Sequence, residues 1–542
     1  METFNPAPEA DRHQSKDAIL WLVLVALAAL VRLGPITSGL PYIDYVDEGH
    51  VLHPVIRILK GETDPSVSIY PPATSYLIVV AAKAYTPFYR MFHHHGWRRD
   101  LPTDREYRTP LGERYDLIAP PEIIWLGRLV VALLSVGTVM VAGTLAKVVG
   151  GARAGWLAML FTALCPALVS RGSIVIIDTT ATFFAVVTLY LCQRLRVFAA
   201  ANRPALWRGA ACAGVAAGLA FGAKYTVGAV FAAVLVTILT LPLAWKGKAI
   251  LILSAGGGLL IGVLGGVVGT VFHLERIVVL LRLLVSGDYQ AIRSDQNYWS
   301  AALSASEIGV PLMIAGLASI VWMCWNVSTR RVALSWIAFA LLLVLAVAWA
   351  NFQPFRNLLS LVPPFCIAVA LLFDRLLHFF EHQSRPLIRW LAVGVILFLT
   401  LSLARATLQH LQPRLTHIDT RVRAIDWIQQ HATKEETVLG LQELSVLPGE
   451  WNRVAARCTV VPWFEALDLL ERQRFDYIVT GDLDLRYAPD PNAWASYLDR
   501  WKTKVAPLAV QADFGQVVTP VMPYLWRTAD ERILILRGNA RE

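Results

Sequence analysis

Residues 44–54 read DYVDEGHVLHP and form the densest acidic cluster of the chain. Within ten residues the stretch holds three carboxylates, Asp44, Asp47 and Glu48, and two histidines, His50 and His53. A carboxylate can act as a general base or bind a divalent metal. It can also simply begin a helix, because the positive end of the helix dipole favours an acid there. The surroundings of the cluster must decide between these interpretations.

Five further charged residues lie at or near the ends of apolar segments. Arg128 falls within the first turns of one segment, and Arg171 and Asp178 bracket the short turn RGSIVIID. Lys224 sits in GLAFGAKYT and Arg356 in NFQPFRNLLSLVPP. Charges at membrane depth are costly and usually face a cavity where they have a function. Lys and Arg suit a phosphate, so acids and bases gathered at one face indicate a site.

The composition of the chain sets the class of protein that must position these residues. The chain has 542 residues, of which 56% are hydrophobic and only 16% charged, and its mean hydropathy is +0.51. A soluble domain carries roughly 25% charged residues. The net charge of +9 would indicate nucleic acid in a soluble protein. Here many basic residues lie in short loops between apolar runs, which indicates membrane topology and no nucleic acid.

Apolar runs long enough to cross a bilayer recur along the chain, since a spanning helix needs about twenty residues. The pattern predicts a polytopic α-helical membrane protein of about 11–12 spans. Segment 72–88 is a twelfth candidate, which begins at Pro71-Pro72. The eleven clear spans are 18–36, 122–147, 154–171, 175–192, 207–223, 225–244, 249–271, 308–326, 332–349, 357–374 and 388–405.

The distribution of Lys and Arg predicts the orientation of these spans. If the amino terminus is cytoplasmic and 72–88 does not cross, most Lys and Arg near span ends lie inside. We therefore interpret 72–88 as a re-entrant or interfacial helix. The Arg-rich loop 89–120 is outside in this arrangement, against the rule, but long loops follow it poorly. DYVDEGHVLHP then lies at the outer face, together with Arg128, Arg171, Asp178, Lys224 and Arg356.

The carboxy-terminal part of the chain has a different texture. Short apolar strand patterns such as TVLGL, FDYIVTGD and RILILRG alternate with amphipathic helical patterns. This alternation predicts a small α/β domain, which the eleventh span leaves outside the cell membrane. The predicted organisation is a cytoplasmic segment 1–17, a transmembrane catalytic domain 18–408 with first outer loop 37–120, and an extracytoplasmic α/β domain 409–542.

Several of these motifs resemble a known superfamily. VDEGHVLHPVIRILKGE followed by YPP is similar to the first outer loop of the membrane-embedded C-type glycosyltransferases (GT-C). That superfamily includes the protein O-mannosyltransferases, the aminoarabinose transferases of lipid A and the Rgt-type lipopolysaccharide sugar transferases. The Arg171-to-Asp178 turn, the Gly218-to-Tyr225 segment and the Arg356-to-Pro363 segment are also similar. The resemblance covers about 18–375, more by order and placement than by identity.

The resemblance implies a polyprenyl-phosphate-linked sugar donor in the outer leaflet and a sugar transfer with inversion. Asp47 would be the catalytic base, and Glu48 and Asp178 would orient the acceptor or a metal. Lys224 and Arg356 would hold the departing phosphate, with Arg128 and Arg171 added to that donor phosphate-binding set. The acceptor could be a glycolipid, a polysaccharide or a protein. No cofactor is required, and a divalent metal has no support in the sequence.

Each assignment has a structural alternative. Asp178 could simply pair with Arg171, and Lys224 and Arg356 could snorkel from span ends. Arg128 lies deeper, so a structural salt bridge is a serious alternative there. Because no second ligand set accompanies the histidines, we expect surface residues rather than a metal site. These histidines are His50, His53, His93, His94 and His95.

Two other classes of function remain open. The first is a transporter or flippase of an anionic lipid-linked substrate. Transporters often carry inverted repeats, and no paired halves are visible here. The second is a non-catalytic membrane scaffold, which leaves the acid and base placements unexplained. We expect an integral protein of the inner (plasma) membrane, surrounded by membrane lipids, with its site facing outward.

Overall fold

The protein is described from a computed structural model in which two compact units are distinguished. Unit 1 consists of 1–36, 61–84 and 126–413, and unit 2 of 37–60, 85–125 and 414–542. The structure describes residues 8–43, 46–61, 71–94, 108–109, 112–113, 119–201, 206–271, 298–348, 355–381, 386–416, 418–441, 448–461, 463–481, 491–514 and 532–538.

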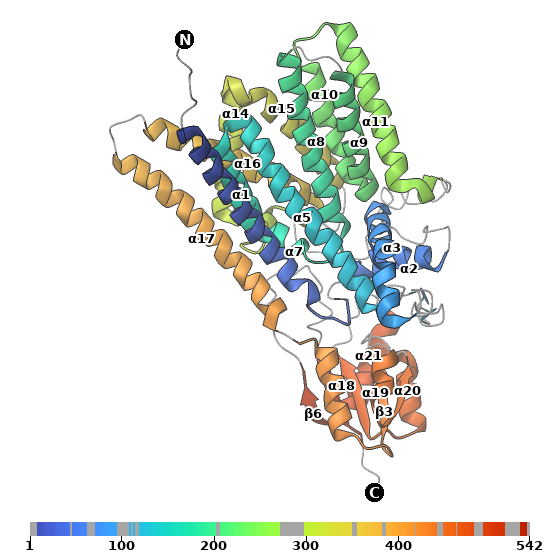
Figure 1. The fold of residues 1–542 in the computed structure, drawn as a ribbon. Helices are drawn as coiled ribbons and strands as arrows, with labels where there is room; N and C mark the ends of the chain where they lie inside the picture. Colours follow the sequence, from blue (N-terminus) through green and yellow to red (C-terminus); the bar gives the residue numbers. More distant parts are fainter. Residues whose placement is uncertain are drawn as a thin grey trace, which may run out of the picture. The chain divides into compact units, whose positions relative to one another are not determined.

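Unit 1 is built from helices, and α8, α9, α10 and α11 stand side by side in it, drawn in green in Figure 1. The helices that lie wholly or mainly in this unit are α1 (Pro8–Leu33), η1 (Gly34–Thr37), α3 (Ala73–His93), α5 (Pro121–Gly150), α6 (Ala152–Leu164), α7 (Pro166–Arg171), α8 (Ile177–Ala200), α9 (Leu206–Ala223), η3 (Tyr225–Val230), α10 (Phe231–Leu239), α11 (Trp245–Val271), α13 (Tyr298–Leu303), α14 (Val310–Trp325), α15 (Val327–Ala348), η5 (Phe355–Leu361), α16 (Val362–Glu381) and α17 (Pro386–Thr416).

The predicted fold class is confirmed. Among the described residues, 8 helices are long and apolar enough to cross a membrane. Three shorter apolar helical segments, Ala152–Leu164, Tyr225–Leu239 and Val310–Trp325, fall on the remaining predicted spans. Helix α3 covers the twelfth candidate, but it is not among the eight. The predicted re-entrant or interfacial role of 72–88 stays a prediction.

Helices α9 and α11 pack with their backbones in contact. A Cβ added at Gly214 or Gly218 of α9 would meet backbone atoms of α11, and one added at Gly262 of α11 would meet the backbone of α9. Small residues allow this approach, which stabilises helix pairs in lipid through van der Waals packing. The seam, as we call this contact, runs along α9 to its last turn, where Gly222 faces Gly266. It therefore fixes the end of α9, immediately before Lys224.

Unit 2 contains a five-stranded mixed sheet of order β4-β3-β5-β7-β6. Strand β3 is parallel to β4 and β5, whereas β7 is antiparallel to β5 and β6. Helices α18, α19 and α20 accompany the sheet in Figure 1. The elements of this part are α18 (Thr420–His431), β3 (Thr437–Leu441), α19 (Pro448–Arg453), β4 (Arg457–Val461), α20 (Trp463–Arg472), β5 (Tyr477–Gly481), α21 (Pro491–Val505), β6 (Ala509–Asp513) and β7 (Ile533–Arg537).

The core of the sheet follows from its strand order. The central strands β3, β5 and β7 contribute buried residues such as Leu439, Val479 and Ile535, and α18 contributes Ile425 and Ile428. The edge strands β4 and β6 are more exposed, because each has a neighbour on one side only. This small sheet is the α/β element that the sequence pattern indicated.

Unit 2 also contains segments from the amino-terminal part of the chain. These are α2 (Val46–Lys60) and the short antiparallel pair β1 (Arg108–Thr109) and β2 (Gly112–Glu113). Helix α2 carries Asp47 and Glu48 in its first turn and buries Leu52 and Val55. The sequence pattern gave no sign that 37–60 groups with the sheet. The domain limits predicted above stay a prediction.

Candidate active site

The strongest polar constellation in unit 1 joins Asp178 to Lys224. The Lys224 Nζ lies 2.5 Å from Asp178 Oδ1 and donates a second hydrogen bond, of 2.8 Å, to Asn357 Oδ1. The Lys224 side chain is 14% exposed and that of Asp178 4%. Three segments far apart in the sequence therefore converge on one ammonium group.

Each member of this constellation sits where a helix begins or ends. Asp178 lies in the first turn of α8, where the helix dipole favours an acid. Lys224 follows the last residue of α9, and its backbone N–H still bonds to the Ala220 carbonyl. It is also the N-cap of η3, with extended backbone dihedrals. The seam between α9 and α11 thus determines the position of this lysine.

Hydroxyl groups fix the segment that carries Asp178. The Thr182 hydroxyl donates to the Asp178 carbonyl at 2.7 Å and is hydrogen bonded to Ser360 at 3.1 Å. The Thr179 hydroxyl donates to the Arg171 carbonyl at 2.8 Å. The contact between Thr182 and Ser360 joins two helices, α8 and η5. As a result, Asp178 and Asn357 are held at a fixed separation.

The network continues beyond the residues that sequence reasoning identified. Asn357 Nδ2 donates to the Tyr298 hydroxyl at 3.1 Å, and that hydroxyl donates to the Val347 carbonyl at 3.3 Å. Sequence analysis missed both Asn357 and Tyr298. Asn357 had a signal, since it directly follows Arg356 in the RNLLS stretch. Arg356 is partly exposed in the same short helix, η5. It is therefore adjacent to Asn357, which accepts a hydrogen bond from Lys224.

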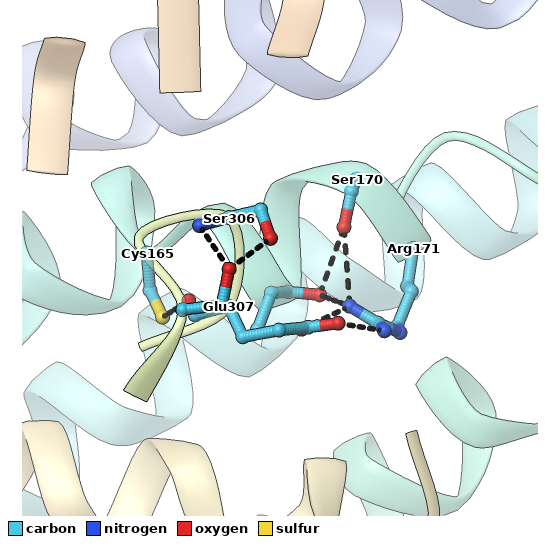
Figure 2. Close-up of polar contacts among 7 residues, drawn as sticks. Cys165, Ser170, Arg171, Ser306 and Glu307 are labelled. Atoms are coloured by element: carbon cyan, nitrogen blue, oxygen red, sulfur yellow. Dashed lines mark hydrogen bonds and ion pairs between the residues drawn. The ribbon is translucent and has the colours of Figure 1, made fainter. Parts of the chain in front are cut away.

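Arg171 is held by a residue that the sequence analysis did not consider. Its guanidinium makes a two-pronged ion pair with Glu307, at 2.7 Å from Nη1 to Oε2 and 2.6 Å from Nη2 to Oε1. Figure 2 shows the two groups facing each other, with Ser170 beside them. Both side chains are only 3% exposed. Burial raises the pKa of the Glu307 carboxyl, while the adjacent Arg171 opposes that shift.

The backbone around Glu307 closes this pair further. The Glu307 carbonyl accepts from the Ala167 N–H at 3.1 Å and faces the Cys165 thiol at 3.7 Å, as Figure 2 shows for the thiol. The turn between α13 and α14 is therefore tied to α7 through both backbone and side chain. A guanidinium neutralised in this way is poorly suited to receive a phosphate. The contact with Glu307 argues against the phosphate-binding role predicted for Arg171.

Arg128 is also deeply placed. Its side chain lies in α5 with 0% exposure, and Nη1 donates to the Ile36 carbonyl in η1 at 3.0 Å. This contact joins two helices of unit 1, and it is a hydrogen bond to a backbone carbonyl rather than a salt bridge. The predicted contact of Arg128 with a donor phosphate stays a prediction.

The acidic pair of the opening motif lies in unit 2. Glu48 is fully buried, at 0% exposure, whereas Asp47 is partly exposed. Asp47 is therefore the more accessible of the two carboxylates. Asp44 of the same motif lies outside the described residues.

The histidines show one correction. His53 is buried, so the expectation of a surface residue was wrong there, because it lies on α2 among the buried residues Leu52, Val55 and Ile56. His93 and His94 are exposed, and His93 stacks on Tyr89 with ring centroids 4.2 Å apart. His95 lies outside the described residues. Within the described ranges, no group of three His, Cys, Asp or Glu side chains is arranged to hold a metal ion.

One family model matches part of the chain. Residues 121–284 match the model of the dolichyl-phosphate-mannose-protein mannosyltransferase family. This range includes Arg128, Arg171, Asp178 and Lys224. Among curated proteins, none matches the chain significantly by sequence.

Solved structures show the fold. The apo structure of ArnT from Cupriavidus metallidurans is 15% identical, with a TM-score of 0.52 over 96% of this chain and 98% of that one. The same protein bound to undecaprenyl phosphate gives a TM-score of 0.50 with the same identity and coverage. The oligosaccharyltransferase of Archaeoglobus fulgidus is 14% identical, with a TM-score of 0.46 over 85% of this chain and 68% of that one. The match to the mannosyltransferase family covers 121–284 only, and the full-length likeness to ArnT shows the fold of this chain.

Proposed function

We propose that this protein is an inverting glycosyltransferase that moves a sugar from a polyprenyl phosphate to an acceptor at the outer face of the membrane. The observation that carries the proposal is the Lys224 ammonium, held by Asp178 and Asn357 at the end of α9. An ammonium has three donors, and two of them are used by these acceptors. The third can reach a phosphate oxygen through the part of the side chain that stays exposed.

This geometry and the relatives support a polyprenyl-phosphate donor. ArnT, whose fold is similar, has been solved with undecaprenyl phosphate. The leaving phosphate of a lipid-linked sugar gains negative charge in the transition state, and fixed cations in a partly dry site stabilise that charge. Lys224 and Arg356 supply these cations. Arg171 is neutralised by Glu307 and Arg128 is buried against Ile36, so we assign both of them to holding the helices in place.

The reaction is a single displacement. Asp47 takes the proton from an acceptor hydroxyl, and the oxygen attacks the anomeric carbon of the sugar. The bond between that carbon and the phosphate oxygen breaks, and the phosphate leaves with the electron pair. Inversion at the anomeric carbon follows from attack on the side opposite the leaving group. A positioned base of this kind typically contributes about 10²–10⁴-fold to the rate.

Three residues support these groups. Asp178 positions Lys224 through their ion pair, and Asn357 completes that arrangement. Glu48 is buried and follows Asp47 in the first turn of α2, where it orients the start of this helix. The acceptor is a glycolipid, a polysaccharide or a protein. The distribution of Lys and Arg supports an extracytoplasmic site, which we assign to the inner membrane.

The test is transfer of labelled sugar from a panel of polyprenyl-phosphate sugars, with the purified protein in lipid. We expect wild type to turn over, Asp47→Asn to bind donor without turnover, and Lys224→Ala to lose donor affinity. Lys248→Ala is the matched control, because Lys248 Nζ donates only to the Leu239 carbonyl among the described residues. Full turnover by Asp47→Asn would remove the assigned base.

The alternative is a transporter or flippase of an anionic lipid-linked substrate. The same experiment separates the two functions, since a flippase binds the donor and moves it without cleaving it. Donor that wild type binds but never cleaves, with every acceptor tried, would favour the flippase.

A further inference from the structure

A residue of the carboxy-terminal α/β part contacts Tyr42 and Ile43, which precede the acidic motif DYVDEGHVLHP. Arg421, at the start of α18, is 1% exposed and donates through Nη2 to the Ile43 carbonyl at 3.1 Å. Its guanidinium carbon lies 4.1 Å from the centroid of the Tyr42 ring, a cation–π geometry. Tyr42 and Ile43 are themselves buried. All of these residues belong to unit 2.

Arg421 is itself fixed by a buried ion pair. Asp419 Oδ2 accepts from Arg421 Nη2 at 2.6 Å, and Oδ1 accepts from Nε at 2.9 Å. Asp419 Oδ1 also accepts from the Arg421 backbone N–H at 2.8 Å, which makes Asp419 the N-cap of α18. The guanidinium is therefore oriented by the first turn of a helix whose residues Ile425 and Ile428 enter the sheet core.

The anchored residues lie only a few positions before Asp47. Asp47 lies four positions after Ile43. A chain spans at most about 3.6 Å per residue, so their Cα atoms lie within about 14 Å. Helix α2 begins at Val46 and buries Val51 and Leu52. Asp47 is thus confined from both sides, by the Arg421 contact before it and by the buried face of α2 after it.

We infer that Arg421 is a positioning residue for Asp47, and that the carboxy-terminal α/β part serves catalysis by holding the chain just before α2. This inference rests on the proposed function, in which Asp47 is the base. Arg421 touches neither donor nor acceptor in this account. It acts through Tyr42 and Ile43, so its loss displaces the base and leaves the phosphate-binding residues of unit 1 as they are.

The first test compares Arg421→Ala with Arg423→Ala. Arg423 lies on the same helix, but its guanidinium lies over Phe514 of the α/β part itself, 5.2 Å from the ring centroid. For Arg421→Ala we expect kcat per folded molecule to fall about 10²-fold, the cost of a small misplacement of a reacting group. KM for the lipid donor should stay within about twofold of wild type, and Arg423→Ala should keep both constants. Arg421→Lys keeps the charge without the planar fork, so its kcat should fall between the two.

A second readout does not depend on turnover. Amide hydrogen exchange in residues 46–52 should become faster in Arg421→Ala and stay unchanged in Arg423→Ala. Tyr42→Leu removes the cation–π contact from the other side, while the Arg421–Asp419 pair and the hydrogen bond to the Ile43 carbonyl are kept. It should change both readouts in the same direction, by less than Arg421→Ala, and it tests the contact even if Arg421→Ala does not fold.

The outcomes separate this inference from the proposed function. Wild type without any sugar transfer, or Asp47→Asn with full transfer, would overturn the function. Wild type that is active and Asp47→Asn that is inactive, together with wild-type kcat in folded Arg421→Ala or Tyr42→Leu, would overturn the inference alone. A lower unfolding temperature with unchanged kcat per folded molecule would likewise reduce Arg421 to a purely structural residue.

Discussion

The two ends of one short segment hold two ion pairs of opposite character. At its start, Arg171 meets Glu307 through two hydrogen bonds and both side chains are sealed from solvent. At its end, seven residues later, Asp178 meets Lys224 through one contact, and the lysine stays partly exposed. The first pair uses a rigid fork that matches a carboxylate. The second uses a point charge that donates to only two acceptors among the described residues, so one of its three donors remains.

The comparison shows which cation can serve a substrate. At both ends a cation meets a carboxylate, and both pairs are largely buried. Neither the charges nor the burial therefore distinguishes a structural pair from a functional one. The useful quantities are the number of donors that remain and the exposure of the charged group. By these measures we assign Lys224 to the proposed site and Arg171 to the framework that supports it.

The largest expected effect comes from breaking the buried Arg171–Glu307 pair. Glu307→Ala leaves the Arg171 charge buried without its carboxylate, and the loss of one partner of such a pair costs about 3–5 kcal/mol in the free energy of unfolding. The double variant Arg171→Met, Glu307→Met removes both charges and should recover much of that stability. Thermal unfolding in detergent measures both. A wild-type unfolding temperature for Glu307→Ala would contradict the structural role.

Breaking the Asp178–Lys224 pair should affect sugar transfer more than the stability of the fold. Asp178→Asn removes a charge-assisted bond to Lys224, worth about 1.5–3 kcal/mol, which corresponds to about 10- to 100-fold in donor binding or turnover. Its unfolding temperature should fall much less than that of Glu307→Ala. The two variants, assayed side by side for unfolding and sugar transfer, should exchange rank between the two measurements. The same rank in both would remove the distinction drawn here.

The seam that positions Lys224 offers a third test. Gly218→Ala adds a Cβ that would meet the backbone of α11, and overpacking of this kind typically costs about 1–3 kcal/mol. Gly257→Ala is the matched control on α11, because its Cβ would meet nothing within 4 Å. Turnover per folded molecule and unfolding temperature should both fall for Gly218→Ala only. Equal behaviour of the two variants would show that the close approach does not constrain the lysine.

The smallest effect is expected at Tyr298, the far end of the Lys224 network. Tyr298→Phe removes the hydroxyl that accepts from Asn357, a bond worth about 0.5–1.5 kcal/mol. We therefore expect a loss of less than about tenfold in donor affinity. Tyr190→Phe serves as control, since the structure shows no hydrogen bond of the Tyr190 hydroxyl to the described residues. A loss as large as that of Asp178→Asn would extend the functional network to Tyr298.

The helices were predictable from the sequence, because the length and apolarity of a span are local properties. The convergence of Asp178 and Lys224 was predictable in outline, since a common orientation placed both at one face. The partners Glu307 and Asn357 were not. Glu307 lies 136 residues from Arg171, and only the packing of α7 against the turn before α14 brings the two together. Spacing along the chain carries no record of such a contact.

The contact of Arg421 with Ile43 was hidden for the same reason, and more strongly. It joins residues separated by 378 positions, and all the predicted spans except the first lie between them in the sequence. Nothing in the local pattern of TRVRAIDWIQQHA distinguishes Arg421 from Arg423. Burial is what separates them: Arg421 is enclosed, and Arg423 is partly exposed.

The close backbone contact of α9 and α11 has a consequence for the protein in bilayers of different thickness. Helices respond to hydrophobic mismatch by tilting or by sliding relative to their neighbours. Two helices whose backbones interlock at successive glycines cannot slide without a clash, so they must tilt as one body. The depth of Lys224 then changes with the pair as a whole and not with either helix alone. We expect the rate of sugar transfer to vary smoothly with acyl-chain length, without the abrupt loss that a slipped helix register would cause.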